Sequence, residues 1–226
     1  ANVGLVNYFG KHQQVDNLQV APVMLRKGNT TMALYGLGNV RDERLHRAFA
    51  EKRVQMLQPP MSEEEAEELF SVMLIHQNRA QHSSKNFVTE LMLPEFLDLV
   101  VWGHEHECLV TPQQTAGRDF FVSQPGSSVA TSLCPGEAKD KHVAILEINR
   151  GRFQLRGIPL TTVRPLVIED MNLLAENVPK DLKSMHKALV ERVNEMIEKA
   201  KEQSVEMLPL CRLCVELSDG YDKIPP

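Results

Sequence analysis

The sequence predicts an α/β protein, because short apolar runs typical of buried strands alternate with segments of helical character. Two such runs, residues 70–75 (Phe-Ser-Val-Met-Leu-Ile) and 97–102 (Leu-Asp-Leu-Val-Val-Trp), are each followed by polar residues that include histidine. Residues 81–96 lie between them and are long enough for the crossover that joins two parallel strands. We therefore expect the two runs to form neighbouring parallel strands, preceded by a helix over residues 41–53.

The residues before the first run predict a hairpin and a capped helix. Residues 20–25 and 31–37 have the character of strands, and the turn residues 27–29 (Lys-Gly-Asn) separate them. Ser62 is a candidate N-cap, and Glu65 stands three residues later in the capping-box position. We expect a helix to begin at this point.

After Trp102 the pattern changes to short strands. The predicted strands are residues 108–110, 120–123, 142–148 and 153–158. Residues 149–152 (Asn-Arg-Gly-Arg) form a predicted hairpin turn between the last two.

A second structural unit is predicted to begin near residue 161. Residues 163–168 have the character of a strand, and a helix with one apolar face follows. The apolar positions of that helix are Leu182, Met185, Leu189, Val193 and Met196. Packing of a small α+β domain explains this pattern.

Histidines follow both long apolar runs. Gly103 ends the second run and His104 and His106 come next, whereas His76 ends the first. In an extended backbone alternate side chains share a face, so His104 and His106 are expected to point the same way. Parallel neighbours would bring His76 to the same sheet edge, where open α/β sheets bind their ligands. The pattern predicts a metal site, although imidazole suits several metals. The alternative is three unrelated polar residues at strand ends.

Positive charge near these histidines is limited. Arg79 and Lys85 lie just after His76, in a loop at the mouth of the predicted site, where they could contact phosphates. Ordinary solvated cations would look the same. The net charge of −5 argues against a surface coated by nucleic acid, but a local basic groove is compatible with it.

Nothing in the sequence predicts a membrane protein. No apolar run is long enough to cross a bilayer, and no signal peptide opens the chain. Four cysteines fit a reducing compartment. We expect an intracellular protein without a membrane partner.

Several long motifs in order resemble those of one known family. They are residues 33–38, 42–45, 75–79 (Ile-His-Gln-Asn-Arg), 101–108 (Val-Trp-Gly-His-Glu-His-Glu-Cys) and 123–129 (Ser-Gln-Pro-Gly-Ser-Ser-Val). The chain resembles the calcineurin-like metallophosphoesterases and, more closely, the meiotic-recombination-eleven family. That family is the nuclease subunit of the eukaryotic complex that repairs DNA double-strand breaks.

The resemblance covers nearly the whole chain and implies an architecture. It is strongest from residue 20 to 159 and weaker after residue 178. It implies that residues 1–160 are the carboxyl-terminal part of a four-layer α/β/β/α nuclease sandwich, with the short strands after Trp102 completing its second sheet. Residues 161–226 would be an incomplete capping domain that contacts DNA.

The resemblance also implies a two-manganese site of which this sequence holds one half. His76, His104 and His106 match three of the family's seven metal ligands. The other four, and the histidine proposed as the catalytic acid, lie in motifs that do not occur in this sequence. A two-metal site holds its ions roughly 3.5–4 Å apart, and a bridging carboxylate normally fixes that spacing. We expect no catalytic residue in this chain and no nuclease activity from these residues alone.

The intact protein would resemble a manganese-dependent 3′–5′ exonuclease and single-strand endonuclease of the nucleus. It would act in homologous recombination and meiosis. Its implied partners are DNA, an SMC-like coiled-coil ATPase, a nibrin-type adaptor and a second copy of itself. Two alternatives remain: a different metallophosphoesterase acting on nucleotides or phosphoproteins, and a non-catalytic scaffold that binds DNA and repair partners.

Overall fold

The computed structural model describes residues 4–11, 17–79, 85–202, 206–217 and 221. The chain divides into two compact units, each built from two stretches of sequence. The first unit comprises Ala1–Gly126 and His142–Ile158, and the second comprises Ser127–Lys141 and Pro159–Pro226. The polypeptide therefore enters the second unit, returns to the first and leaves it again.

A six-stranded sheet forms the centre of the first unit. Its order is β2 (Val23–Lys27), β3 (Thr30–Gly36), β5 (Leu69–His76), β6 (Leu99–Gly103), β8 (Phe121–Gln124) and β7 (Leu109–Gln114). The four inner strands are parallel, and each edge strand is antiparallel to its neighbour. The predicted parallel pairing of the two long apolar runs is confirmed, and it places His76 opposite Gly103.

The two faces of this sheet are covered differently. On one face, Tyr35, Val100 and Trp102 belong to a core cluster that also holds Leu45 and Ala48 of α1 (Asp42–Ala50). The other face packs Phe70, Val72 and Leu99 against side chains of β9 (His142–Asn149) and β10 (Arg152–Pro159). Alternate residues of β5 thus serve opposite cores, as the period of two in a strand requires.

The expected membership of the second sheet was wrong in part. Residues 121–124 and 109–114 join the main sheet as β8 and β7, and β8 pairs in parallel with β6. Only β9 and β10 form a separate two-stranded sheet. A short apolar run fixes that a strand forms but not which strand it pairs with, because pairing depends on distant residues. The described residues form a mixed α/β fold.

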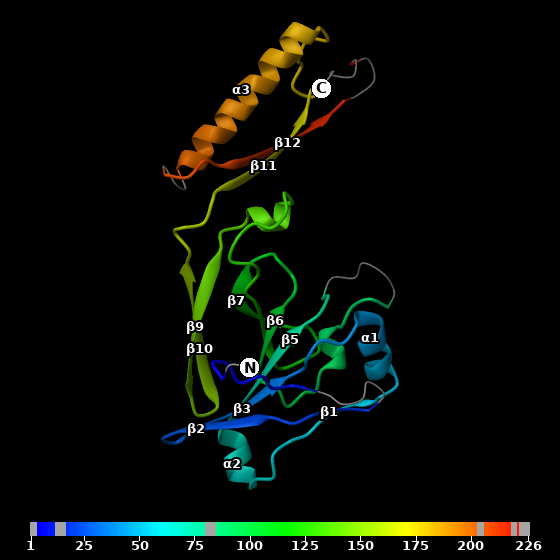
Figure 1. Cartoon of the computed structure of the whole chain (residues 1–226), viewed down its shortest axis with the longest axis vertical. Helices are drawn as coiled ribbons and strands as arrows, with labels where there is room; N and C mark the ends of the chain where they lie inside the picture. Colours follow the sequence, from blue (N-terminus) through cyan, green and yellow to red (C-terminus); the bar gives the residue numbers. More distant parts are fainter. Residues whose placement is uncertain (1–3, 12–16, 80–84, 203–205, 218–220, 222–226) are drawn as a thin grey trace. The chain divides into compact units, whose positions relative to one another are not determined.

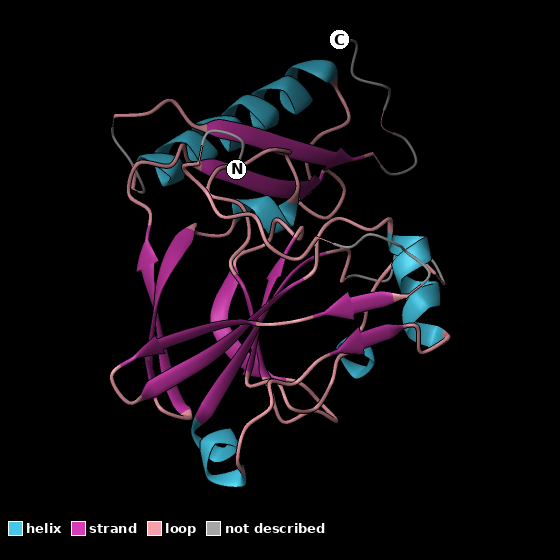
Figure 2. Cartoon of the chain, turned by 60° about the horizontal axis from the view of Figure 1, so that its bottom comes forward, coloured by secondary structure: helices cyan, strands magenta, loops and turns pink. Residues whose placement is uncertain are grey.

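The smaller elements of the first unit follow local signals. β1 (Leu18–Val20) and β4 (Val54–Met56) form a parallel pair, and η1 (Glu90–Met92) is a single 3-10 turn. α2 (Glu63–Glu68) begins with the predicted capping box: the Ser62 hydroxyl accepts from the Glu65 amide at 3.3 Å, and the Ser62 amide donates to the Glu65 carboxylate at 3.0 Å. Both α1 and α2 lie at the periphery of the first unit, and neither lies between strands (Figure 2).

The second unit is a parallel strand pair with one long helix. β11 (Leu166–Asn172) pairs with β12 (Leu210–Glu216), and α3 (Leu182–Lys201) lies along them, as Figure 1 shows. The predicted apolar face of α3 is buried at Met185 and Met196, whereas Leu182 is exposed. The stretch Ser127–Lys141 of this unit contributes η2 (Pro135–Ala138), which contacts β11. Among the described residues, no helix has both the length and the apolar character needed to cross a membrane.

Candidate active site

His76 and His104 lie side by side at the carboxyl end of the main sheet. Their ring centroids are 5.3 Å apart, and the ring planes meet at 83°. Gly103 makes this arrangement possible, because a Cβ on residue 103 would lie 2.8 Å from Nδ1 of His76. The space that the His76 ring occupies therefore explains why residue 103 is glycine.

The backbone of residues 104–106, which hold His104 and His106, was expected to be extended, but it is not extended at His104. β6 ends at Gly103, and His104 has a φ of 79°, in the left-handed region that ordinary residues rarely adopt. Alternation along a strand therefore does not apply to His104 and His106, and that part of the sequence argument was wrong. All three histidines are exposed to solvent.

A cleft of about 880 Å³ opens beside the two adjacent rings. Its lining includes His76, Gln77, His104 and the amino-terminal turn of α1. In that turn, Asp42 accepts hydrogen bonds from the side chain and the amide of Asn78, at 2.8 and 3.3 Å. His106 is not among the residues that line the cleft. The structure thus brings two of the three predicted ligands to one cleft.

A two-metal centre needs more than this part of the chain provides. Within the described ranges, no group of three or more His, Cys, Asp or Glu side chains is placed to hold a metal ion. Two neutral imidazoles supply neither a bridge nor charge compensation for a pair of divalent ions. By themselves, the described residues do not fit a two-metal site.

Arg79 points into the protein and is held by several partners. Its Nε lies 2.7 Å from the Glu90 carboxylate, and one terminal nitrogen donates to the Gln124 side chain at 3.0 Å. The guanidinium also lies 5.6 Å from the centroid of the Trp102 ring. Lys85, by contrast, is an exposed residue. Their predicted contacts with phosphates remain predictions.

Further hydrogen bonds join the two histidine segments. The Glu105 carboxylate accepts from the Arg79 amide at 2.7 Å, and the indole of Trp102 donates to the Gln77 carbonyl at 2.9 Å. The side-chain Nε2 of Gln124 donates to the Glu107 carbonyl at 3.0 Å. Sequence reasoning gave no role to Glu90, Glu105 and Gln124, because their bonds to Arg79 join residues that are distant in the chain.

The loop after β8 packs closely against the second histidine segment. Gly126 has a φ of 73°, and a Cβ there would lie 2.7 Å from the His106 carbonyl oxygen and 2.9 Å from the Cys108 nitrogen. Only glycine fits this close approach in this conformation. The Ser-Gln-Pro-Gly sequence therefore supports the histidine segment through its backbone.

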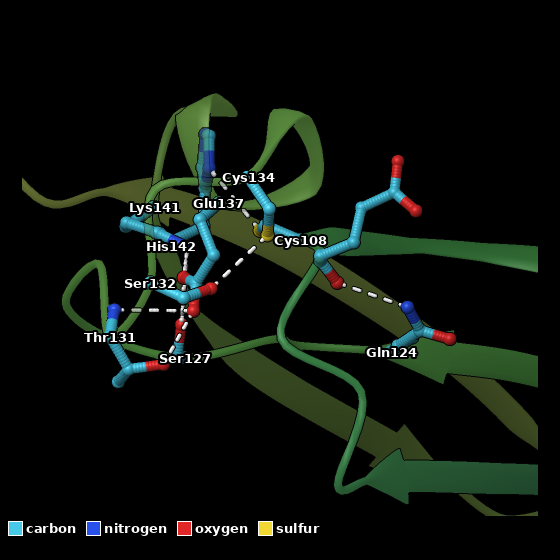
Figure 3. Close-up of polar contacts among 10 residues, drawn as sticks. Cys108, Gln124, Ser127, Thr131, Ser132, Cys134, Glu137, Lys141 and His142 are labelled. Carbon is cyan, nitrogen blue, oxygen red and sulfur yellow. Dashed lines mark hydrogen bonds and ion pairs between the residues drawn. The ribbon is translucent and has the colours of Figure 1, made fainter. Parts of the chain in front are cut away.

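The second unit contains a polar cluster that the sequence did not single out (Figure 3). The Lys141 ammonium lies 2.8 Å from the Glu137 carboxylate and 3.1 Å from the Ser127 hydroxyl. Glu137 also accepts from the Ser127 hydroxyl at 2.8 Å and from the Thr131 hydroxyl and amide at 2.6 and 3.1 Å. The Ser127 hydroxyl thus donates to Glu137, accepts from Lys141 and forms part of this buried cluster.

Comparison with known proteins gives consistent matches. A family model described as the Mre11 DNA-binding presumed domain matches residues 153–226. The chain is 48% identical over 206 residues to the double-strand break repair protein mus-23 of Neurospora crassa, covering 88% of this chain and 28% of that protein. It is 44% identical to the double-strand break repair protein MRE11 of Arabidopsis thaliana and 42% identical to that of Homo sapiens. Those two alignments cover 98% and 97% of this chain and 32% of each relative. The chain therefore spans less than a third of these proteins.

Proposed function

Because this chain belongs to the Mre11 family, we propose that it acts in DNA double-strand break repair as part of a manganese-dependent nuclease. The proposed activity of the longer protein is 3′–5′ exonuclease and single-strand endonuclease. The observation that carries this proposal is the adjacency of His76 and His104 beside an open cleft, at the carboxyl ends of parallel strands.

In this proposal the chain supplies part of the metal site. His76, His104 and His106 would each present an imidazole nitrogen to manganese, and the remaining ligands would come from parts of the longer protein outside this sequence. Two ions would supply charge stabilisation for phosphodiester hydrolysis. The residues of this chain would place the imidazoles at the cleft and hold them in a fixed position relative to each other.

The remaining assignments are part of the same proposal. Residues 1–160 would belong to the nuclease domain and residues 161–226 to a DNA-binding cap, which the family model over residues 153–226 supports. The longer protein would work in the nucleus as a homodimer, with an SMC-like ATPase and a nibrin-type adaptor. The names of two relatives, 48% and 42% identical to this chain, support the role in double-strand break repair on which these assignments depend.

The test is cleavage of a labelled single-stranded oligonucleotide in Mn²⁺ by the longer protein that contains this chain. His104→Ala should lower the rate by more than the roughly 10–100-fold that losing a residue behind a metal ligand costs. The control is Arg152→Ala, which removes an exposed side chain of β10 that is not among the residues lining the cleft and should leave the rate unchanged. The 226-residue chain alone should show no manganese-dependent cleavage. Robust cleavage by the chain, or full activity of His104→Ala, would reject the proposed role.

A non-catalytic scaffold is the second candidate, favoured by the lack of a three-residue metal-binding group in the part of the chain described. In that case, binding of the longer protein to DNA would survive His104→Ala and its cleavage activity would be absent from the start. DNA binding and manganese-dependent cleavage, both measured on the longer protein, separate this candidate from the nuclease.

A further inference from the structure

We propose that Arg79 is a positioning residue that ties the two histidine-bearing segments together, and that it does not serve mainly as a contact for DNA phosphates. The inference rests on the proposed function only in giving the histidines a purpose. The geometry that supports it belongs entirely to the first unit.

The guanidinium connects three separate parts of that unit. Arg79 follows β5, its partner Glu90 is in η1, and its partner Gln124 ends β8. Gln124 extends the connection, because its side-chain Nε2 donates to the Glu107 carbonyl at 3.0 Å. One side chain thus links the end of β5, through β8, to the segment that holds His104 and His106.

The backbone of Arg79 makes a second link to the same segment. Its amide donates to the Glu105 carboxylate at 2.7 Å, between the two histidines in sequence. Trp102, the residue before Gly103, donates from its indole to the Gln77 carbonyl. Residues on both sides of His104 are therefore bonded to the residues that follow His76.

The chemistry of arginine suits this position. A guanidinium is planar, is always charged and offers several donors in a fixed fork, so it can bond Glu90 and Gln124 at once. It can also lie over the Trp102 ring, which favours a cation. Only 22% of the Arg79 side chain is exposed, and that of Glu90 is 19% exposed. A phosphate would have to compete with a carboxylate already in place.

The single tryptophan of the chain makes the proposal measurable. Trp102 is fully buried, so its fluorescence reports on this network without interference from another indole. We would compare the wild-type chain with Arg79→Ala, Arg79→Lys and Glu90→Gln, using acrylamide quenching and amide hydrogen exchange measured by mass spectrometry. Arg152→Ala is the matched control, since Arg152 is an exposed arginine of the same unit.

The expected result is local. Arg79→Ala should speed exchange roughly tenfold or more at residues 77–79 and 104–107, and it should increase quenching of Trp102. Exchange in β3 and in α1 should stay within about twofold of wild type. Arg79→Lys should rescue only part of the protection, because an ammonium cannot reproduce the fork. Arg152→Ala should change neither readout.

Three results would overturn the inference. Unchanged exchange in both histidine segments together with weaker DNA binding by the longer protein would identify Arg79 as a phosphate contact. Uniformly faster exchange across the first unit would identify a general stabilising role. Complete rescue by Arg79→Lys would show that charge suffices and the fork does not matter. If Arg79→Ala does not fold, Glu90→Gln decides, since it keeps the side-chain shape and should give a smaller increase at the same residues. The exchange and quenching measurements need neither metal nor DNA, so they succeed or fail independently of the nuclease proposal.

Discussion

The Arg79 network of the first unit and the Lys141 network of the second solve different problems. The Lys141–Glu137 pair is buried almost completely, with side chains 2% and 0% exposed, whereas Arg79 and Glu90 are 22% and 19% exposed. A buried ion pair costs desolvation, which only a complete set of hydrogen bonds offsets. A partly solvated pair avoids most of that cost and instead fixes the positions of its neighbours.

The two networks also differ in how far they reach along the chain. The side chains of Ser127 and Thr131, which bond the buried pair, lie within the same short stretch, and Glu137 and Lys141 are four residues apart. Arg79 joins residues that are 11 and 45 positions away. The Lys141 network organises one local segment, whereas the Arg79 network holds together strand ends that only the folded sheet brings near each other.

The largest effect is expected from breaking the buried pair on one side. Lys141→Met should destabilise the second unit by about 3–5 kcal/mol, because it leaves the Glu137 carboxylate buried without a cation. Urea unfolding followed by circular dichroism measures the change. The double variant Lys141→Met with Glu137→Leu should recover much of the loss. A loss below about 1 kcal/mol for the single variant would contradict the burial argument.

A smaller and pH-dependent effect is expected at Asp98 of the first unit. Burial raises the pKa of this carboxyl above its ordinary value. The hydrogen bond that the carboxylate accepts from the Ser71 amide, at 2.6 Å, opposes this shift in pKa. A raised pKa means that the folded state binds the proton more tightly. Stability is therefore greatest below the ordinary pKa and falls as pH rises through the folded value.

Asp98→Asn removes this titration and keeps an oxygen that can accept from Ser71. Relative to wild type, the variant should therefore gain stability as pH rises from about 3 to about 7. Urea midpoints at both ends of that range provide the measurement. If the difference in stability between Asp98→Asn and wild type is the same at both pH values, then burial does not raise the pKa of Asp98.

The smallest effect is expected at an exposed pair with the same spacing as the buried one. Lys187 and Glu191 are also four residues apart, but they lie 3.7 Å from each other with side chains 75% and 61% exposed. Lys187→Ala should change the free energy of unfolding by only about 0–0.5 kcal/mol. Comparison with Lys141→Met isolates burial as the variable. An effect of comparable size at the two sites would remove the basis of the contrast.

Local signals in the sequence predicted local structure well. The Ser62–Glu65 capping box, the start of α1 at Asp42 and the burial of Met185 and Met196 all follow from residues within a few positions of one another. The parallel pairing of β5 with β6 was also predicted, because both strands are long, apolar and separated by a crossover. The caps and the buried helix face depend on short-range periodicity and capping chemistry, whereas the strand pairing was inferred from the length of chain between the two runs.

Distant relations were predicted less completely. The sequence indicated His76 and His104 as neighbours, yet the left-handed turn at His104 arises where β6 ends and was not foreseen. Arg79 was interpreted from its charge and its place near His76. Its partners Glu90 in η1 and Gln124 in β8 could not be predicted, because only the folded sheet brings them next to Arg79.

The sequence by itself therefore determined the α/β class, the helix starts, the histidine-bearing strand ends and, through its motifs, the family resemblance. Only the tertiary structure decided which strands share the main sheet, how the ring of His76 explains Gly103, and what the charges of Arg79 and Lys141 face. The physical reason is the range of each interaction. Periodicity and capping are fixed by neighbours along the chain, whereas strand pairing and ion pairing depend on groups that meet only after folding.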